Sequence, residues 1–198
     1  HNTFPLVSLL SQLETSNSTT FNREGCIVDA ISSFPFYDLP NNTKIFITCA
    51  NKILGSFPGL SIIGIHRDYI DLIEYIEDFS YLNLGMYLQY AKKQQLPTTA
   101  PTHLFQHLKK VLSNFDLEEI RNKIVQNSCR IVNEVGSENV IGENICPVIT
   151  VSKKCIPDFI ATKYQLYGIN STSEYYQIFT YSAEQKDYDN FINDLKVC

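Results

Sequence analysis

Residues 44–50, Lys-Ile-Phe-Ile-Thr-Cys-Ala, carry the clearest strand pattern in this 198-residue chain. Successive side chains of a strand point to opposite faces, and here neither face carries a charged residue after Lys44. The stretch therefore predicts a strand that packs on both faces. The two alternating sets are Ile45, Ile47 and Cys49 on one face and Phe46 and Thr48 on the other.

Two further runs with strand-like composition flank this stretch, at residues 26–31 and 60–65. Turn-forming residues separate the three runs, namely Pro40-Asn41-Asn42 and Pro58-Gly59. We therefore expect the first third of the chain to form short strands. A short amphipathic helix is predicted before them, at residues 4–14.

The middle of the chain has helical periodicity instead. Apolar residues recur at helical spacing after Asp68, a suitable helix cap, and a second helical stretch runs to about Gln95. A Pro-Thr-Thr-Ala-Pro linker at residues 97–101 precedes a third predicted helix. Residues 116–119, Asp-Leu-Glu-Glu, resemble a capping box and predict a further helix that ends near Cys129.

The last third again favours strands, at residues 145–151, 163–169 and 175–181, because β-branched and aromatic residues dominate there. Asp187 could cap a closing helix. Short strands at both ends of the chain around a central helical segment predict an α+β fold. The length fits a single domain over residues 1–198.

Six cysteines and three N-glycosylation sequons indicate an oxidising, secretory compartment. The sequence thus predicts a secreted or lumenal, disulfide-stabilised glycoprotein whose signal peptide has been removed. The expected pairs are Cys26–Cys49, Cys146–Cys155 and Cys129–Cys198. The asparagines expected to be exposed and to accept glycans are Asn17, Asn41 and Asn170.

Charge and hydropathy exclude two classes of partner. The net charge is -5, and basic residues occur in no run longer than a pair, so general nucleic-acid binding is not expected. The longest apolar stretches, such as residues 60–65, are too short to span a bilayer.

The histidines are the candidates for metal binding or catalysis. His103 and His107 stand four residues apart on a predicted helix, but Leu104 takes the place of the glutamate in an HExxH motif. Two imidazoles alone supply too few ligands, so a solvated helix flank is the preferred interpretation. His66 follows a strand-like run and could act as an acid or base. We expect no metal and no cofactor, and no catalytic set can be assigned.

Part of the chain resembles the second half of the secreted acid ribonucleases of the T-two type. The resemblance covers Tyr81-Leu82 and the helix to Lys92-Lys93, the helix start at residues 115–120, and the spacing of Cys129, Cys146 and Cys155. The His-Gly-Leu-Trp-Pro segment of that family's active site is missing, and the chain has no Trp. The resemblance therefore implies a relative without catalytic activity.

The function that the sequence favours is binding. The partner could be a protein, a glycan or an apolar ligand, and a divergent secreted hydrolase is the alternative. The helical segment at residues 68–128 contains no sequon and is rich in tyrosine, a residue enriched at interfaces. The predicted contact residues are Tyr75, Tyr81 and Tyr87.

Overall fold

The computed structural model describes residues 25–73 and 83–197, which form two compact units. The first unit takes its described residues from 1–31, 39–51 and 56–113. The second unit takes its described residues from 32–38, 52–55 and 114–198. The helix predicted for residues 4–14 lies outside the described residues.

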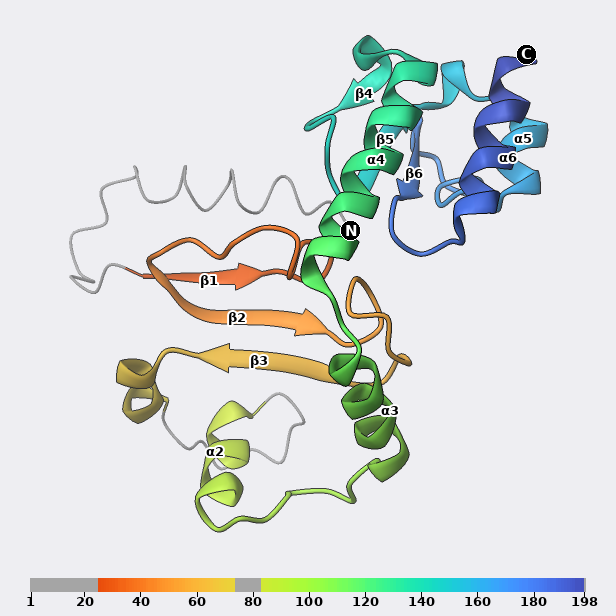
Figure 1. Ribbon diagram of the computed structural model, residues 1–198. Helices are drawn as coiled ribbons and strands as arrows, with labels where there is room; N and C mark the ends of the chain where they lie inside the picture. The colour runs from red at the N-terminus through yellow and green to blue at the C-terminus, as the bar shows by residue number, and fades with distance from the viewer. Residues whose placement is uncertain (1–24, 74–82, 198) are drawn as a thin grey trace, which may run out of the picture. The chain divides into compact units, whose positions relative to one another are not determined.

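The first unit is built on a three-stranded sheet with the order β1-β2-β3 (Figure 1). Its strands are β1 (Cys26–Asp29), β2 (Thr43–Cys49) and β3 (Ser61–Ile65), close to the three predicted runs. β1 pairs with β2 in parallel, whereas β2 pairs with β3 antiparallel. A parallel pair needs a long connection, and residues 30–42 supply it.

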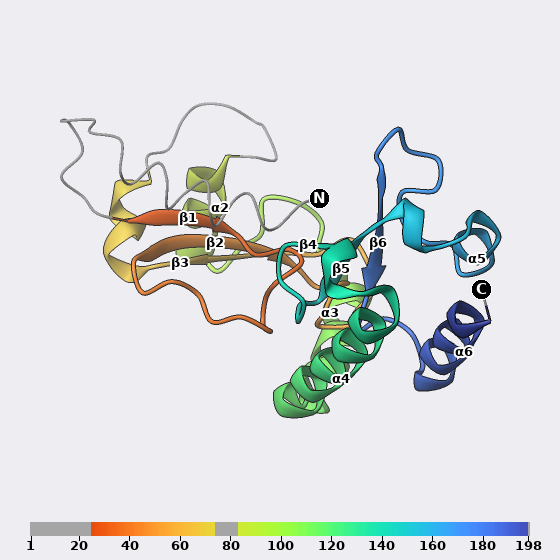
Figure 2. The same ribbon diagram turned by 90° about the horizontal axis from the view of Figure 1, so that it is seen from above.

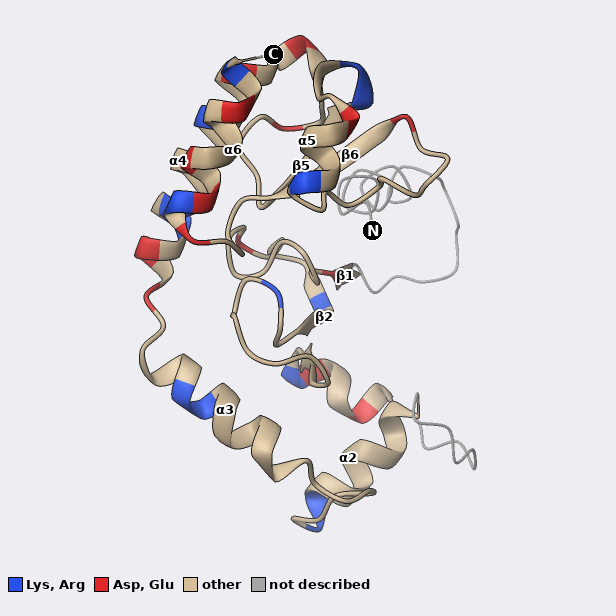
Figure 3. Ribbon diagram, turned by 90° about the vertical axis from the view of Figure 1, so that its right-hand side faces the viewer, with Lys and Arg blue, Asp and Glu red and all other residues tan. Residues whose placement is uncertain are grey.

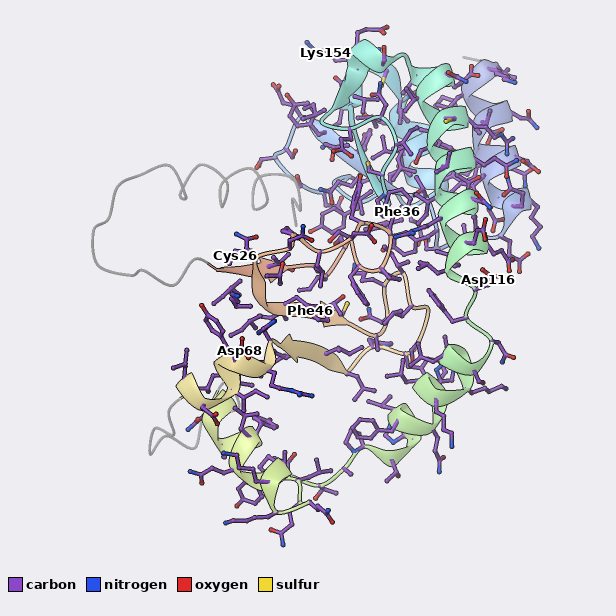
Figure 4. The ribbon with its side chains drawn as sticks, turned by 60° about the vertical axis from the view of Figure 1, so that its left-hand side comes forward. Cys26, Phe36, Phe46, Asp68, Asp116 and Lys154 are labelled. Carbon is purple, nitrogen blue, oxygen red and sulfur yellow. The ribbon has the colours of Figure 1, made fainter. Side chains whose placement is uncertain are left out.

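One close approach inside this sheet requires a glycine. Gly64 on β3 stands opposite Phe46 on β2, and the Phe46 ring lies over the glycine. A Cβ atom at position 64 would collide with that ring. Figure 4 shows Phe46 on β2 and Cys26 at the start of β1.

Two helical elements of the first unit begin at side chains that cap them. The 3-10 helix η1 (Arg67–Leu72) starts after His66, and α2 (Leu84–Lys92) starts after Asn83, whose Oδ1 accepts from the Met86 N–H at 3.0 Å. α3 (Thr102–Ser113) follows the predicted proline-rich linker. No residue of α3 is buried.

The second unit combines an antiparallel sheet of order β4-β5-β6 with three α-helices. Figure 2 shows this unit from above, with α4 and α6 labelled. Its core is a contiguous apolar cluster that includes Ile131 on α4 and Ile149 on β5. The elements are α4 (Leu117–Val135), η2 (Ser137–Asn139), β4 (Val140–Ile141), β5 (Val148–Ser152), η3 (Lys153–Cys155), α5 (Asp158–Lys163), β6 (Tyr175–Phe179) and α6 (Gln185–Lys196).

α4 begins where the capping box predicts, but it continues beyond Cys129 to Val135. Asp116 stands at its start (Figure 4), and Asp116 Oδ1 accepts from the backbone N–H groups of Glu118 and Glu119. The helix ends at Gly136, which has a φ of 83° that few other residues tolerate.

The strand predicted at residues 163–169 is wrong. Lys163, the first residue of that range, is the last residue of α5, which starts directly after Pro157. Within the range, only Tyr167 forms a β-bridge, an isolated one with Gln177. Gln165 and Gly168 have φ angles of 50° and 106°, which interrupt an extended backbone. The β-branched and aromatic composition does not reveal these turns.

The predicted disulfide framework is also wrong. The described cysteines all have free thiols, so none of them forms one of the three expected disulfides. They are Cys26, Cys49, Cys129, Cys146 and Cys155. Cys198, the remaining cysteine, lies outside the described residues. An even cysteine count says nothing about distance, and only spatial proximity permits a bridge.

Both α4 and α6 carry basic as well as acidic residues (Figure 3). On these helices the ion pair between Arg130 Nη1 and Asp189 Oδ1 spans 2.7 Å. Within residues 25–73 and 83–197, no helix has both the length and the apolarity that crossing a membrane requires.

Candidate functional site

The carboxyl ends of the parallel strands β1 and β2 lie at one edge of their sheet, because the strands run in the same direction. Asp29 is the last residue of β1 and stands opposite Ile47. The pairing continues one residue further, since the Ala30 N–H donates to the Ile47 carbonyl at 2.8 Å. In open sheets with parallel strands, ligands bind outside the carboxyl ends of those strands.

Two side chains hold the chain at this edge. Thr48 is 1% exposed, and its Oγ1 donates to the Ala30 carbonyl at 3.2 Å. Asp29 is half-buried, and its Oδ1 accepts from the Ile31 N–H at 3.0 Å. This local turn fixes the orientation of the Asp29 carboxylate at the end of the strand.

The chain leaves β2 through a closed loop, residues 50–56. The Ser56 N–H donates to the Ala50 carbonyl at 2.8 Å, and the Gly55 N–H donates to the Lys52 carbonyl at 2.9 Å. Gly55 has a φ of 72°, a conformation that favours glycine. Ile53 and Leu54 are buried, so the loop is anchored by its apolar side chains as well.

Lys52 is the chemically distinctive residue of that loop. It is half-buried, and its Nζ lies 4.9 Å from the centroid of the Phe179 ring. Among the described residues, no carboxylate forms an ion pair with it. A lysine without a carboxylate partner can serve as an amine nucleophile toward a carbonyl compound.

The three histidines singled out by the sequence have separate roles. His66 is exposed and accepts from the Asp68 N–H at the start of η1. His103 is exposed on α3, whereas His107, one turn later, is 3.0 Å from Ser56 Oγ through its Nδ1. His107 is thus engaged in a protein contact. In the described part of the chain, no three His, Cys, Asp or Glu residues are placed to hold a metal.

A surface cleft of about 530 Å³ in the second unit is an alternative site. Two of its charged groups pair with each other, because Asp194 Oδ2 accepts from Lys163 Nζ at 2.6 Å, and it also accepts from the Tyr164 hydroxyl at 2.6 Å. These hydrogen bonds lower the pKa of Asp194 and raise that of Lys163. Paired groups of this kind favour a structural role for the cleft.

The remaining predicted residues give no site. Asn41 and Asn170 are exposed, and Tyr87 is half-buried on α2. Asn17, Tyr75 and Tyr81 lie outside the described residues.

No family model and no curated relative matches the sequence. Solved structures do match the fold. A phosphoserine aminotransferase from Cytophaga hutchinsonii gives a TM-score of 0.68 at 16% identity, over 86% of this chain and 54% of its own. This chain has an aminotransferase-like fold.

Two further structures agree. The ureidoglycine–glyoxylate aminotransferase of Bacillus subtilis gives a TM-score of 0.65 at 15% identity, over 100% of this chain and 56% of its own. The phosphoserine aminotransferase of Trichomonas vaginalis with pyridoxal phosphate (PLP) bound gives 0.59 at 16% identity, over 88% and 51%. The chain therefore spans about half the length of the structures that it matches.

These matches, with the free thiols, correct the fold class and the functions that the sequence favoured. The disulfide-stabilised α+β class is wrong, because the neighbours have the fold of PLP-dependent aminotransferases and the described thiols are free. The secreted binding glycoprotein is wrong for the same reasons, and so are the hydrolase and the ribonuclease relative. Runs of strands and helices along a sequence do not show which strands pair in parallel.

Sequence reasoning passed over Asp29 and Lys52. Each follows from a signal that was present: a carboxylate at the end of one strand, and a lysine just after the next. Recognising Asp29 requires the parallel pairing of β1 with β2, which puts this carboxylate at the carboxyl end of a parallel pair.

Proposed function

We propose that the protein is a PLP-dependent enzyme that acts on the amino group of a small substrate, as aminotransferases do. Fold likeness alone leaves function open, because one fold hosts many activities. The observation that carries the proposal is Lys52, a half-buried lysine without a described ion pair, three residues after the β2 strand.

The residue type fits the cofactor. PLP needs a lysine amine for its aldehyde carbon. Lys52 Nζ would supply that amine.

When bound, PLP withdraws electrons and stabilises negative charge that develops on the α-carbon of an amino substrate. Lys52 would hold the cofactor through its Nζ. Its amine would also serve to move a proton at the substrate α-carbon.

The experiment is covalent trapping. The protein is incubated with PLP, reduced with borohydride and mapped by peptide mass. We expect the label on Lys52 and its loss in Lys52→Arg.

Lys44→Arg is the matched control, because Lys44 lies on β2 and its Nζ is over the Tyr69 ring, 5.2 Å from the centroid. Its label pattern should equal that of the unmodified protein. A label spread evenly over exposed lysines such as Lys92 and Lys109, and unchanged in Lys52→Arg, would contradict the proposal.

A further inference from the structure

His107 contacts the loop that carries Lys52 in two ways. Its Nδ1 is 3.0 Å from Ser56 Oγ, and its ring stacks on Phe57 with centroids 3.9 Å apart and an interplanar angle of 22°. Ser56 is only 8% exposed, so this hydrogen bond is largely shielded from water. Phe57, by contrast, is 55% exposed and has His107 on one of its faces.

Ser56 also closes the loop through its backbone. Its backbone N–H donates to the Ala50 carbonyl at 2.8 Å, so the residue that closes the loop is also the residue that His107 holds. Ala50 is fully buried, and its own N–H donates to the Leu60 carbonyl at 3.0 Å. Both ends of the loop are thereby fixed relative to the β2–β3 sheet.

A third contact brings α3 against the same segment. Gly59 has a φ of 117°, and a Cβ atom there would lie 2.9 Å from Leu104 Cδ1. Leu104 precedes His107 by three residues, so both side chains lie on one face of the helix.

We infer that His107 is a positioning residue, which holds the closed 50–56 loop, and with it the Lys52 backbone, through Ser56 and Phe57. The inference rests on the proposed role of Lys52. His107 does not touch the reacting atoms in this assignment. Its contacts reduce the number of conformations that the loop can adopt. The loop therefore loses less conformational entropy when the cofactor binds.

The test uses four variants and two measurements. Ser56→Ala removes the hydrogen bond and keeps the ring stack. His107→Phe keeps a ring for Phe57 and loses the hydrogen bond, whereas His107→Asn retains a polar group that can bond Ser56. His103→Asn is the control, because His103 is an exposed histidine on the same helix.

The first measurement is amide hydrogen exchange of the peptide that contains Gly55 and Ser56, without cofactor. The second is the borohydride-trapped label on Lys52 at limiting PLP. In Ser56→Ala and His107→Phe we expect faster exchange and about fivefold less label, the effect of losing one neutral hydrogen bond. His107→Asn should recover most of the label, and His103→Asn should match the unmodified protein.

The outcomes separate this inference from the proposed function. If Lys52 takes no label in the unmodified protein, the proposed function fails, and the exchange data still decide whether His107 orders the loop. If Ser56→Ala and His107→Phe lower the melting temperature but leave exchange and label unchanged, the inference is overturned. An equal loss in His103→Asn would also overturn it, because the effect would then belong to α3 as a whole.

Discussion

Asn127 on α4 is fully buried, and both the nitrogen and the oxygen of its side-chain amide form hydrogen bonds. Its Nδ2 donates to the Thr180 carbonyl at 2.9 Å, and its Oδ1 accepts from Gln185 Nε2 at 3.3 Å. Thr180 is also fully buried, and its Oγ1 donates to the Cys146 carbonyl at 3.0 Å. A buried polar side chain is tolerated in the core only when its hydrogen-bonding groups are satisfied, as they are here.

Asn127→Ala should therefore destabilise the protein by about 2 kcal/mol, because it leaves the buried Thr180 carbonyl without this donor. Chemical denaturation measures the change in the free energy of unfolding. Asn122→Ala, at an exposed position of the same helix, should change it by less than about 0.5 kcal/mol. Equal effects of the two substitutions would contradict this account of the core.

At the scale of elements, α4 shows how local signals define a helix. Asp116 Oδ1 accepts from the Glu118 N–H at 2.9 Å and from the Glu119 N–H at 3.1 Å, which satisfies two backbone donors that have no partner within the helix. The two acidic residues in the first turn of α4, Glu118 and Glu119, also interact favourably with the positive end of the helix dipole. The other end is set by Gly136.

Asp116→Ala should cost about 1 kcal/mol of stability, because both capping hydrogen bonds are lost. Asp116→Ser is the matched variant, since a serine hydroxyl can also accept at this position, and it should keep most of the stability. The change is measured by thermal and denaturant unfolding of the three proteins. If serine is no better than alanine, the cap does not contribute in this way.

At the scale of the whole molecule, apolar packing replaces the disulfides that the cysteine count suggested. The second unit has a contiguous apolar core that includes the free thiol of Cys146, which is 3% exposed. Burial of this thiol, with the negative charge of Glu143 adding to the effect, raises the pKa of Cys146 to about 11. The buried cysteine therefore behaves as a small apolar side chain.

A reductant should accordingly leave the melting temperature unchanged, because there is no described bridge for it to break. Alkylation of the native protein at about pH 8, near the ordinary cysteine pKa, should modify Cys146 last, since its thiol is buried and a raised pKa leaves little thiolate. Its rate should increase as the pH rises toward 11. A reductant-induced drop in melting temperature, or rapid alkylation of Cys146 at the lower pH, would contradict the free-thiol core.

The sequence by itself determined most of the elements. The alternation in residues 44–50 and the capping box at Asp116 predicted β2 and the start of α4. Such signals act over a few neighbouring residues, so they can be read without knowing the rest of the fold. At residues 163–169 the composition favours a strand, but the positive φ angles of Gln165 and Gly168 give turns instead.

The tertiary structure alone decided the pairing of the chain and the site. The parallel register of β1 with β2, the separation of the cysteines and the contact of His107 with Ser56 all join residues distant in sequence. The sequence alone suggests His107 as a metal ligand and does not single out Asp29 or Lys52. Local patterns carry no information about which strand ends meet at an edge, because that depends on packing across the whole fold.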